Sequence, residues 1–203
     1  QLLSLKKDYL QVDIENVGEV IANGINFSKV IIRKENEIPL PALVFYSMQK
    51  PTKVIIWLSD KGKANLADSA VLMQKYKQQG YAIVLADLPG IGETADKISE
   101  NDPKYFDESY RNAILGLHVG KPLVGLQTSA LLNLITFINQ NKKLANTTIE
   151  VNAIGISGIA SLHATFLDNK IGKLNLFSPL KSYEEVLSKP LIKNRYVTVI
   201  PNV

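Results

Sequence analysis

Short apolar runs and helical stripes alternate along the chain. The runs Lys53 to Leu58 (KVIIWL) and Tyr81 to Ala86 (YAIVLA) are apolar almost throughout, which is typical of strands buried on both faces. Leu123 to Ile138 places its apolar residues at helical spacing and predicts a helix that packs against a sheet. This alternation predicts an α/β fold, with a mostly parallel sheet covered by helices on both faces and joined by right-handed crossovers.

The N-terminal part of the chain predicts an antiparallel hairpin. Phe27 to Lys34 alternates, with Val30 and Ile32 directed inward. The polar turn Glu35 to Glu37 follows, and Ala42 to Ser47 forms the returning strand. We therefore expect a hairpin ahead of the parallel strands.

Helices are predicted between the strands. After the first apolar run, one stripe predicts a single helix that ends at Gly80. The apolar positions of that stripe are Leu66, Ala70, Met73 and Tyr76. Farther on, Asp102-Pro103 supplies an N-cap and a proline at the first helical position, and so predicts a helix that reaches about His118.

The segment Ile149 to Thr165 (IEVNAIGISGIASLHAT) passes from a β-rich run through a Gly/Ser turn into a helical pattern. A sharp strand-to-helix turn presents its central residue at the carboxyl end of a sheet, and small neighbours allow the two backbones to approach closely. The segment therefore has the pattern of a nucleophile elbow. The residue at its centre decides whether a nucleophile is present.

Two registers of this turn fit the sequence. If Gly155-Ile156-Ser157 begins a G-x-S-x-G motif, Ser157 is the nucleophile, but Ile159 then places a β-branched side chain where a small residue is needed. Moving the frame back by two places puts Gly155 at the turn, between the small residues Ala153 and Ser157. In that register the nucleophile is lost, and glycine adopts the turn at little cost. A Gly/Ser turn without elbow geometry is a third alternative.

Four segments resemble the α/β-hydrolase fold: the opening hairpin, KVIIWL with the loop SDKGKANL, YAIVLADLPGIGET and NAIGISGIASLHAT. The similarity extends over nearly all of residues 1–203, which we interpret as a single domain. Within this fold the chain is most similar to esterases that include acetyl xylan esterases and related bacterial carbohydrate esterases. The resemblance implies one or two more C-terminal strands than Leu174 to Phe177 and Arg195 to Ile200 supply. We therefore expect the chain to be a fragment of a longer protein.

The resemblance also implies where catalytic groups would lie. An oxyanion hole in this fold uses the N–H after the nucleophile and another from the loop after the third strand. The first donor would be the N–H of Gly158 if Ser157 is the nucleophile, or that of Ile156 if Gly155 occupies the turn. The second donor would be the N–H of Asp60 or Lys61. A serine nucleophile further needs a histidine base and an acid. The two histidines, His118 and His163, are expected in surface or structural roles, so the base and the acid are not identified.

The loop Asp87 to Thr94 (DLPGIGET) is similar to a structural loop of the same fold. Asp87 is expected to accept hydrogen bonds from loop N–H groups, and Gly92 to permit close packing. The loop lacks the Gly-Lys-Ser/Thr ending and the spacing of nucleotide-binding loops. The sequence therefore predicts no nucleotide site here.

Composition narrows the classes of partner. The net charge is +4, and dispersed lysines greatly outnumber the three arginines, which argues against a nucleic-acid surface. Cysteine is absent and no His, Asp or Glu cluster has metal-ligand spacing, so we expect neither a metal nor a cofactor. Polar residues interrupt Leu123 to Ile138, so a soluble protein without a membrane-spanning helix is expected. The compartment and the oligomeric state stay open, and export to the periplasm or the exterior of a bacterium fits this composition.

Two hypotheses of function follow from the resemblance. The first is a serine ester hydrolase that acts on an acetylated polysaccharide or a small ester, with Ser157 as the nucleophile. The second is a non-catalytic hydrolase-like module that contributes stability, dimerisation or polysaccharide binding beside an active domain. The occupant of the turn separates them.

Overall fold

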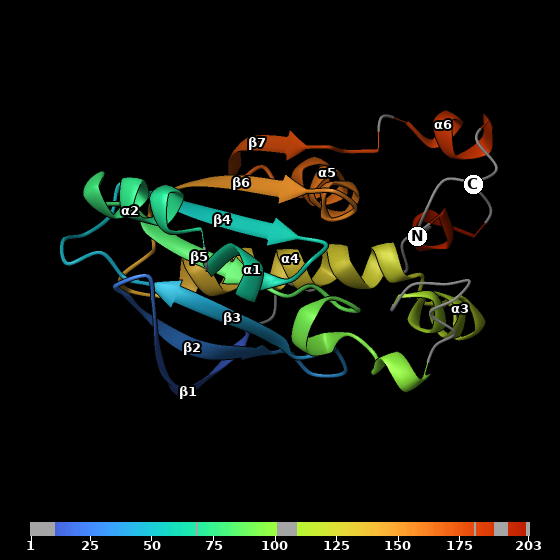
Figure 1. Cartoon of the computed structure of the whole chain (residues 1–203), viewed down its shortest axis with the longest axis horizontal. Coiled ribbons are helices and arrows are strands. Elements are labelled where there is room, and N and C mark those ends of the chain that lie inside the picture. Colours follow the sequence, from blue (N-terminus) through green and yellow to red (C-terminus); the bar gives the residue numbers. More distant parts are fainter. Residues whose placement is uncertain (1–10, 68, 101–108, 181, 189–194, 202–203) are drawn as a thin grey trace.

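A seven-stranded mixed sheet forms the centre of the molecule (Figure 1). The computed structural model describes residues 11–67, 69–100, 109–180, 182–188 and 195–201. The strand order is β1-β2-β3-β5-β4-β6-β7. β1 and β3 run antiparallel to their neighbours, whereas β5, β4, β6 and β7 are mutually parallel. The strands are β1 (Asp13–Ala22), β2 (Ile25–Arg33), β3 (Leu40–Phe45), β4 (Lys53–Ser59), β5 (Ala82–Ala86), β6 (Thr148–Ile154) and β7 (Ile171–Phe177).

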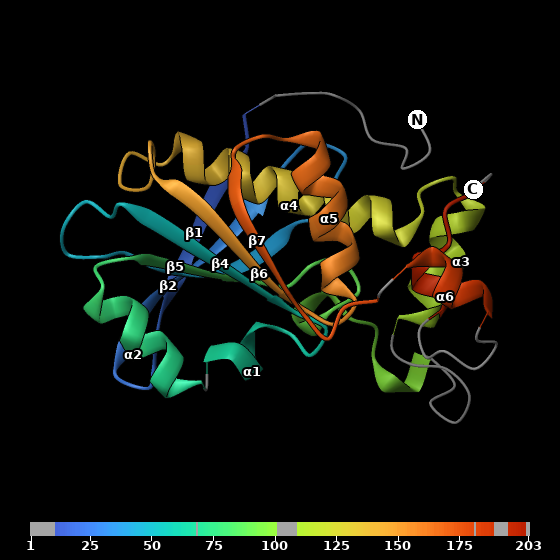
Figure 2. The same cartoon turned by 90° about the horizontal axis from the view of Figure 1, so that it is seen from above.

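Helices cover both faces of this sheet (Figure 2). On one face, α1 (Lys63–Ala67) and α2 (Ala70–Gln78) pack over alternate residues of β4 and β5. On the other, α4 (Leu123–Gln140) and α5 (Ser157–Leu167) close the larger apolar core. The shorter helices α3 (Tyr110–His118) and α6 (Tyr183–Ser188) lie beyond the carboxyl ends of the parallel strands (Figure 1). The predicted α/β class, with an N-terminal antiparallel hairpin and helices on both faces, is confirmed.

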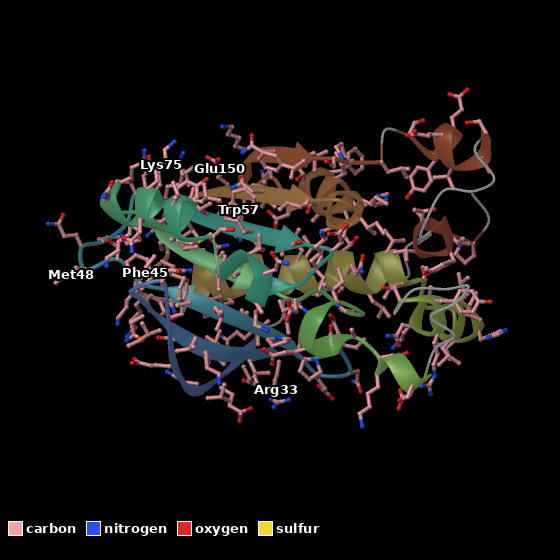
Figure 3. All side chains as sticks on the ribbon, viewed as in Figure 1. Arg33, Phe45, Met48, Trp57, Lys75 and Glu150 are labelled. Atoms are coloured by element: carbon pink, nitrogen blue, oxygen red, sulfur yellow. The ribbon has the colours of Figure 1, made fainter. Side chains whose placement is uncertain are left out.

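The central strands are buried as their apolar runs predict. Every residue of β5 is buried, and in β4 only Lys53 is partly exposed. Trp57 of β4 and Glu150 of β6 lie on the α2 side of the sheet (Figure 3). The ring of Trp57 stacks on Phe177 of β7, with 5.4 Å between the ring centroids. β7 is the last strand of the sheet and is more exposed than β4, β5 and β6.

Several element boundaries differ from the sequence-based predictions. β1 was not predicted, because it lies at the sheet edge and exposes nine of its ten residues, so no apolar pattern marks it. The expected single helix before Gly80 is wrong, since α1 and α2 are separate helices. Arg195–Thr198 forms a short 3₁₀ helix instead of a strand. The predicted helix start at Asp102-Pro103 lies outside the described residues, and α3 is described from Tyr110.

Within the described residues, no helix taken alone has the length and apolarity needed to cross a bilayer. Helices α3 and α4 have the required length and apolarity only when they are taken together, and the pair is bent by 96° at the break between the two helices.

Candidate functional site

The turn between β6 and α5 lies at the carboxyl edge of the parallel strands. Gly155 has φ +64°, in the left-handed region where a side chain is strained, whereas the next residue, Ile156, already has helical angles of −63° and −30°. The N–H of Gly155 donates to the carbonyl of Phe177 across 2.9 Å, which ties the turn to the end of β7. Gly155 therefore occupies the sharp left-handed position between strand and helix.

Asp60 fills the space above Gly155. Asp60 follows the last residue of β4, and a Cβ added to Gly155 would lie only 2.0 Å from its Oδ2 atom. A Cβ and an oxygen cannot approach so closely, so any side chain at position 155 would require Asp60 to move. Asp60 was expected to contribute its backbone N–H, and the position of its carboxylate was not predicted.

Ser157 lies inside the molecule rather than at the mouth of the turn. It is the first residue of α5, has 0% relative exposure, and its Oγ has no hydrogen-bond partner among the described residues. Its carbonyl accepts a hydrogen bond of 2.8 Å from the hydroxyl of Ser161 one turn later. The hydroxyl of Ser157 is thus enclosed at the junction of strand and helix.

Of the four backbone N–H groups proposed for an oxyanion hole, those of Gly158 and Lys61 donate to local acceptors. The N–H of Gly158 donates to the carbonyl of Gly155 across 3.1 Å, and Gly158 itself is buried. In the loop after β4, the N–H of Lys61 donates to the Ser59 hydroxyl, also across 3.1 Å. These two N–H groups are therefore paired within their own turns.

The two histidines lie on different helices. His163 is half-buried on α5, and its Nε2 lies 3.2 Å from the hydroxyl of Tyr183 on α6. Burial lowers the pKa of His163 from its ordinary value of 6.5, which favours the neutral ring. His118 is exposed at the C-terminal end of α3. In the described part of the chain, neither histidine forms a hydrogen bond with Ser157 or Gly155.

The loop after β5 is held by a buried ion pair. The Asp87 carboxylate, 2% exposed, accepts hydrogen bonds from the N–H groups of Lys63 (2.6 Å) and Glu93 (3.0 Å). The ammonium of Lys63 donates to Asp87 across 2.6 Å and also contacts the Glu93 carboxylate. Gly92 packs so tightly that an added Cβ would lie 2.3 Å from the Asp87 side chain. The expected structural roles of Asp87 and Gly92 agree with these contacts.

Lys63 was missed by the sequence interpretation. A lysine at the start of a helix usually faces solvent, and only the separate aspartate in the loop after β5 explains its burial. Within the described ranges, no group of three or more His, Cys, Asp or Glu residues could hold a metal ion.

The comparisons with known proteins concern the fold. No family model matches the chain, and no curated protein matches it in sequence. Its structure is similar to that of acetyl xylan esterase 1 from Thermoanaerobacterium sp., with a TM-score of 0.65, 14% identity, and coverage of 91% of this chain and 58% of that one. For a candidate acetyl xylan esterase from Bacteroides fragilis the TM-score is 0.70 and the identity 14%, and the match covers 85% of this chain and 49% of that one. For a glucuronoyl esterase from Solibacter usitatus the TM-score is 0.56 and the identity 14%, and the match covers 84% of this chain and 52% of that one.

The fold of this chain is therefore α/β-hydrolase-like, as its sequence segments suggested. The neighbouring structures are esterases, several of them named for carbohydrate esters. The chain spans 49% of the length of the Bacteroides protein and 58% of that of the Thermoanaerobacterium enzyme.

Proposed function

We propose that this chain is a non-catalytic α/β-hydrolase-like domain of a carbohydrate-esterase type of protein. It contributes stability, dimerisation or polysaccharide binding beside an active domain. The observation that carries the proposal is the occupant of the turn: the left-handed position holds Gly155, and the carboxylate of Asp60 fills the space that a nucleophile's side chain would need. A glycine offers no atom for covalent attack on an ester.

The enclosure of Ser157 supports the same proposal. A serine nucleophile must present its oxygen to the substrate carbonyl and lie within hydrogen-bond reach of a base. The hydroxyl of Ser157 is fully buried, and neither histidine of the described residues forms a hydrogen bond with it. Attack by Ser157 would need the start of α5 to open.

The competing proposal is ester hydrolysis by the chain itself. This proposal is supported by the esterases found among the structural neighbours. Ser157 would then form an acyl-enzyme with release of the alcohol, and water would release the acid, with backbone N–H groups holding the oxyanion.

Hydrolysis of p-nitrophenyl acetate by the chain and by Ser157→Ala separates the two proposals. We expect both proteins to release nitrophenolate at the rate of buffer with an unrelated protein, while an active acetyl xylan esterase in the same assay gives a rate far above it. A rate above background that Ser157→Ala abolishes, with the fold retained, would overturn the non-catalytic proposal.

A further inference from the structure

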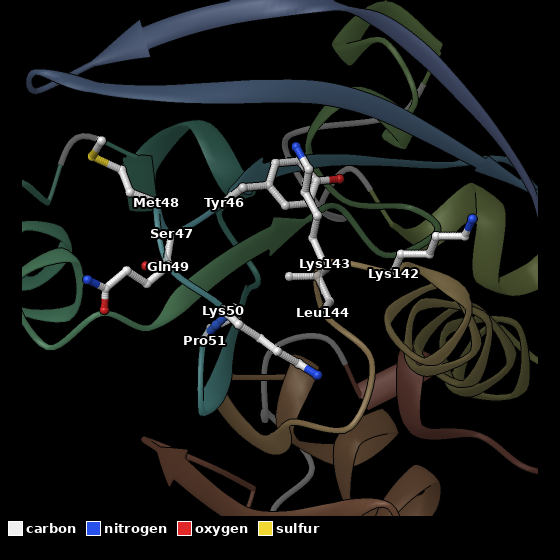
Figure 4. Close-up of a pocket in the computed structure, with 9 residues that line it drawn as sticks. All are labelled: Tyr46, Ser47, Met48, Gln49, Lys50, Pro51, Lys142, Lys143 and Leu144. Carbon is white, nitrogen blue, oxygen red and sulfur yellow. The ribbon is translucent and has the colours of Figure 1, made fainter.

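A hollow lies at the amino ends of the parallel strands, at the opposite end of the sheet from the Gly155 turn. Its volume is about 430 Å³ (Figure 4). Two segments line it: the connection from β3 to β4 and the connection from α4 to β6. The first supplies residues at the amino end of β4, and the second residues at the amino end of β6, so the hollow and the Gly155 turn lie at opposite ends of the parallel strands. The lining residues are Tyr46, Ser47, Met48, Gln49, Lys50, Pro51, Lys142, Lys143 and Leu144.

The lining is positively charged and contains no carboxylate. Lys50 comes from one segment, and Lys142 and Lys143 from the other. Elsewhere in the described structure Lys53, Lys63 and Lys173 form ion pairs with Asp or Glu, but no ion pair involves the three lysines of the hollow. Positive charges around a concavity raise the local concentration of anions there.

Tyr46 adds an oriented donor to these charges. Asn141 donates from Nδ2 to the Tyr46 hydroxyl across 3.1 Å, so the phenol oxygen accepts that bond and its own proton is available to another acceptor. The ammonium of Lys143 lies 5.0 Å from the centre of the Tyr46 ring, which holds this cation beside the hydroxyl. Burial raises the pKa of Tyr46 above its ordinary value, so the hydroxyl keeps its proton at neutral pH.

The floor of the hollow is apolar. Pro51 and Leu144 are buried and face the same space as the tyrosine ring. A ligand that suits both parts carries an anionic oxygen group for the lysines and a carbon skeleton for the floor. The volume is within the range of ordinary small-molecule sites.

We infer that this hollow binds a small organic anion, a carboxylate or a phosphate ester, with Lys143 and the Tyr46 hydroxyl contacting its anionic oxygens. Lys50 and Lys142 extend away from Tyr46 (Figure 4) and contribute long-range charge. The site is separate from the Gly155 turn, and the inference does not depend on whether the chain hydrolyses esters.

The test is a titration of the ¹⁵N-labelled chain with glucuronate, glucose 6-phosphate, inorganic phosphate and neutral glucose at constant ionic strength. We expect the two sugar anions to shift the backbone amides of residues 46–50 and 142–144 in a saturable way, and glucose to leave them unchanged. Saturation by one sugar anion alone identifies its oxygen group as the preferred source. Inorganic phosphate is expected to bind at the same residues more weakly than glucose 6-phosphate, because it lacks the carbon skeleton.

Two variants locate the contacts. Lys50→Gln with Lys143→Gln should raise the dissociation constant at least about tenfold, because the charge-assisted contact of Lys143 and a second positive charge at the hollow are lost. Lys97→Gln with Lys170→Gln removes the same charge from exposed positions elsewhere and should change it less than about twofold. Tyr46→Phe keeps the ring and should weaken binding about threefold.

Three results would overturn the inference. One is the absence of saturable shifts at these residues. Another is equal binding of glucose and its anionic derivatives. The third is equal weakening by the two double variants, because binding would then follow the net charge of the protein and not this hollow.

Discussion

The ammonium of Lys63 and the carboxylate of Asp87 form an ion pair across 2.6 Å, with both side chains almost completely buried. The pair joins the start of α1 to the loop after β5, so it holds together two of the loops at the carboxyl edge of the sheet. Removing one partner of such a pair leaves a buried charge without compensation.

We therefore expect Asp87→Ala to lower the free energy of unfolding by about 3–5 kcal/mol. Glu93 contacts the same ammonium but is 68% exposed, so Glu93→Gln should cost less than about 1 kcal/mol. Urea unfolding followed by circular dichroism measures both. Similar small losses in the two variants would contradict this account of the pair.

The space above Gly155 predicts a second result. Gly155→Ser should destabilise the protein more than Gly80→Ser, since both glycines have similar positive φ angles but only position 155 is obstructed. The left-handed conformation alone costs about 1–2 kcal/mol in each variant. Asp60 is exposed and its side chain can turn aside, so we expect an additional cost of about 1 kcal/mol or less at position 155. In an Asp60→Ala background this additional cost should disappear, and its persistence in urea unfolding would show that Asp60 is not the obstacle.

A third prediction compares two other glycines. Gly92 and Gly120 both have positive φ, but a Cβ would meet Asp87 at Gly92 and nothing within 4 Å at Gly120. Gly120→Ala should lower the unfolding free energy by about 1–2 kcal/mol. Gly92→Ala should cost several times more, because the buried Asp87 carboxylate cannot move without losing Lys63. Thermal unfolding of both variants provides the measurement, and equal shifts would refute the close packing of this loop.

Glu150 predicts a loss of stability in acid. Burial raises its pKa, but the hydrogen bonds and charges around it outweigh burial and lower the pKa below 4.5. The groups responsible are Lys53, Lys173 and Asn175. A depressed pKa in the folded state gives stability that is present above the ordinary pKa and is lost as the pH falls through the folded value.

The wild-type protein should therefore lose stability on acidification below about pH 4.5, and Glu150→Gln should remove part of that loss. Glu184→Gln is the matched control, because Glu184 is exposed on α6. Unfolding in urea at several pH values measures how the free energy of unfolding of each protein changes with pH. Parallel curves for wild type and Glu150→Gln would contradict the prediction.

His163 predicts a separate effect at higher pH. Burial lowers its pKa below 6.5, so the fold favours the neutral ring. Stability from this residue is complete above the ordinary pKa and is lost as the pH falls below it toward the folded value. Histidine signals followed by NMR should show His163 titrating below 6.5, and His163→Gln should flatten the stability curve there. A pKa of His163 at or above 6.5 would show that burial does not control it.

The sequence predicts the central layer of the fold well and its periphery poorly, for a physical reason. Continuous apolar runs such as KVIIWL have few environments in which they are stable, so β4 and β5 are recognised at once. β1 is held mainly by backbone pairing with β2, which any side chains permit, so its sequence carries little signal. The α/β class follows from the first kind of segment.

The candidate site is predictable only where local backbone geometry governs it. The small residues around Gly155 indicate a tight turn, because strand and helix backbones approach there. The position of Asp60 above that turn depends on a loop nearly a hundred residues earlier in the chain, and no local pattern records it. The same limit applies to Lys63 and Asp87, which meet only because β4 and β5 are neighbours.

The stacked pair of Trp57 and Phe177 gives this protein its own optical probe. Trp57 is the single tryptophan of the sequence, and it lies 6% exposed between the centre of the sheet and its last strand. Detachment of β7 would remove the ring that covers this indole and admit water to it, which shifts tryptophan emission to longer wavelength. Fluorescence of the unlabelled chain can therefore report fraying of the sheet edge separately from the circular dichroism of the whole molecule.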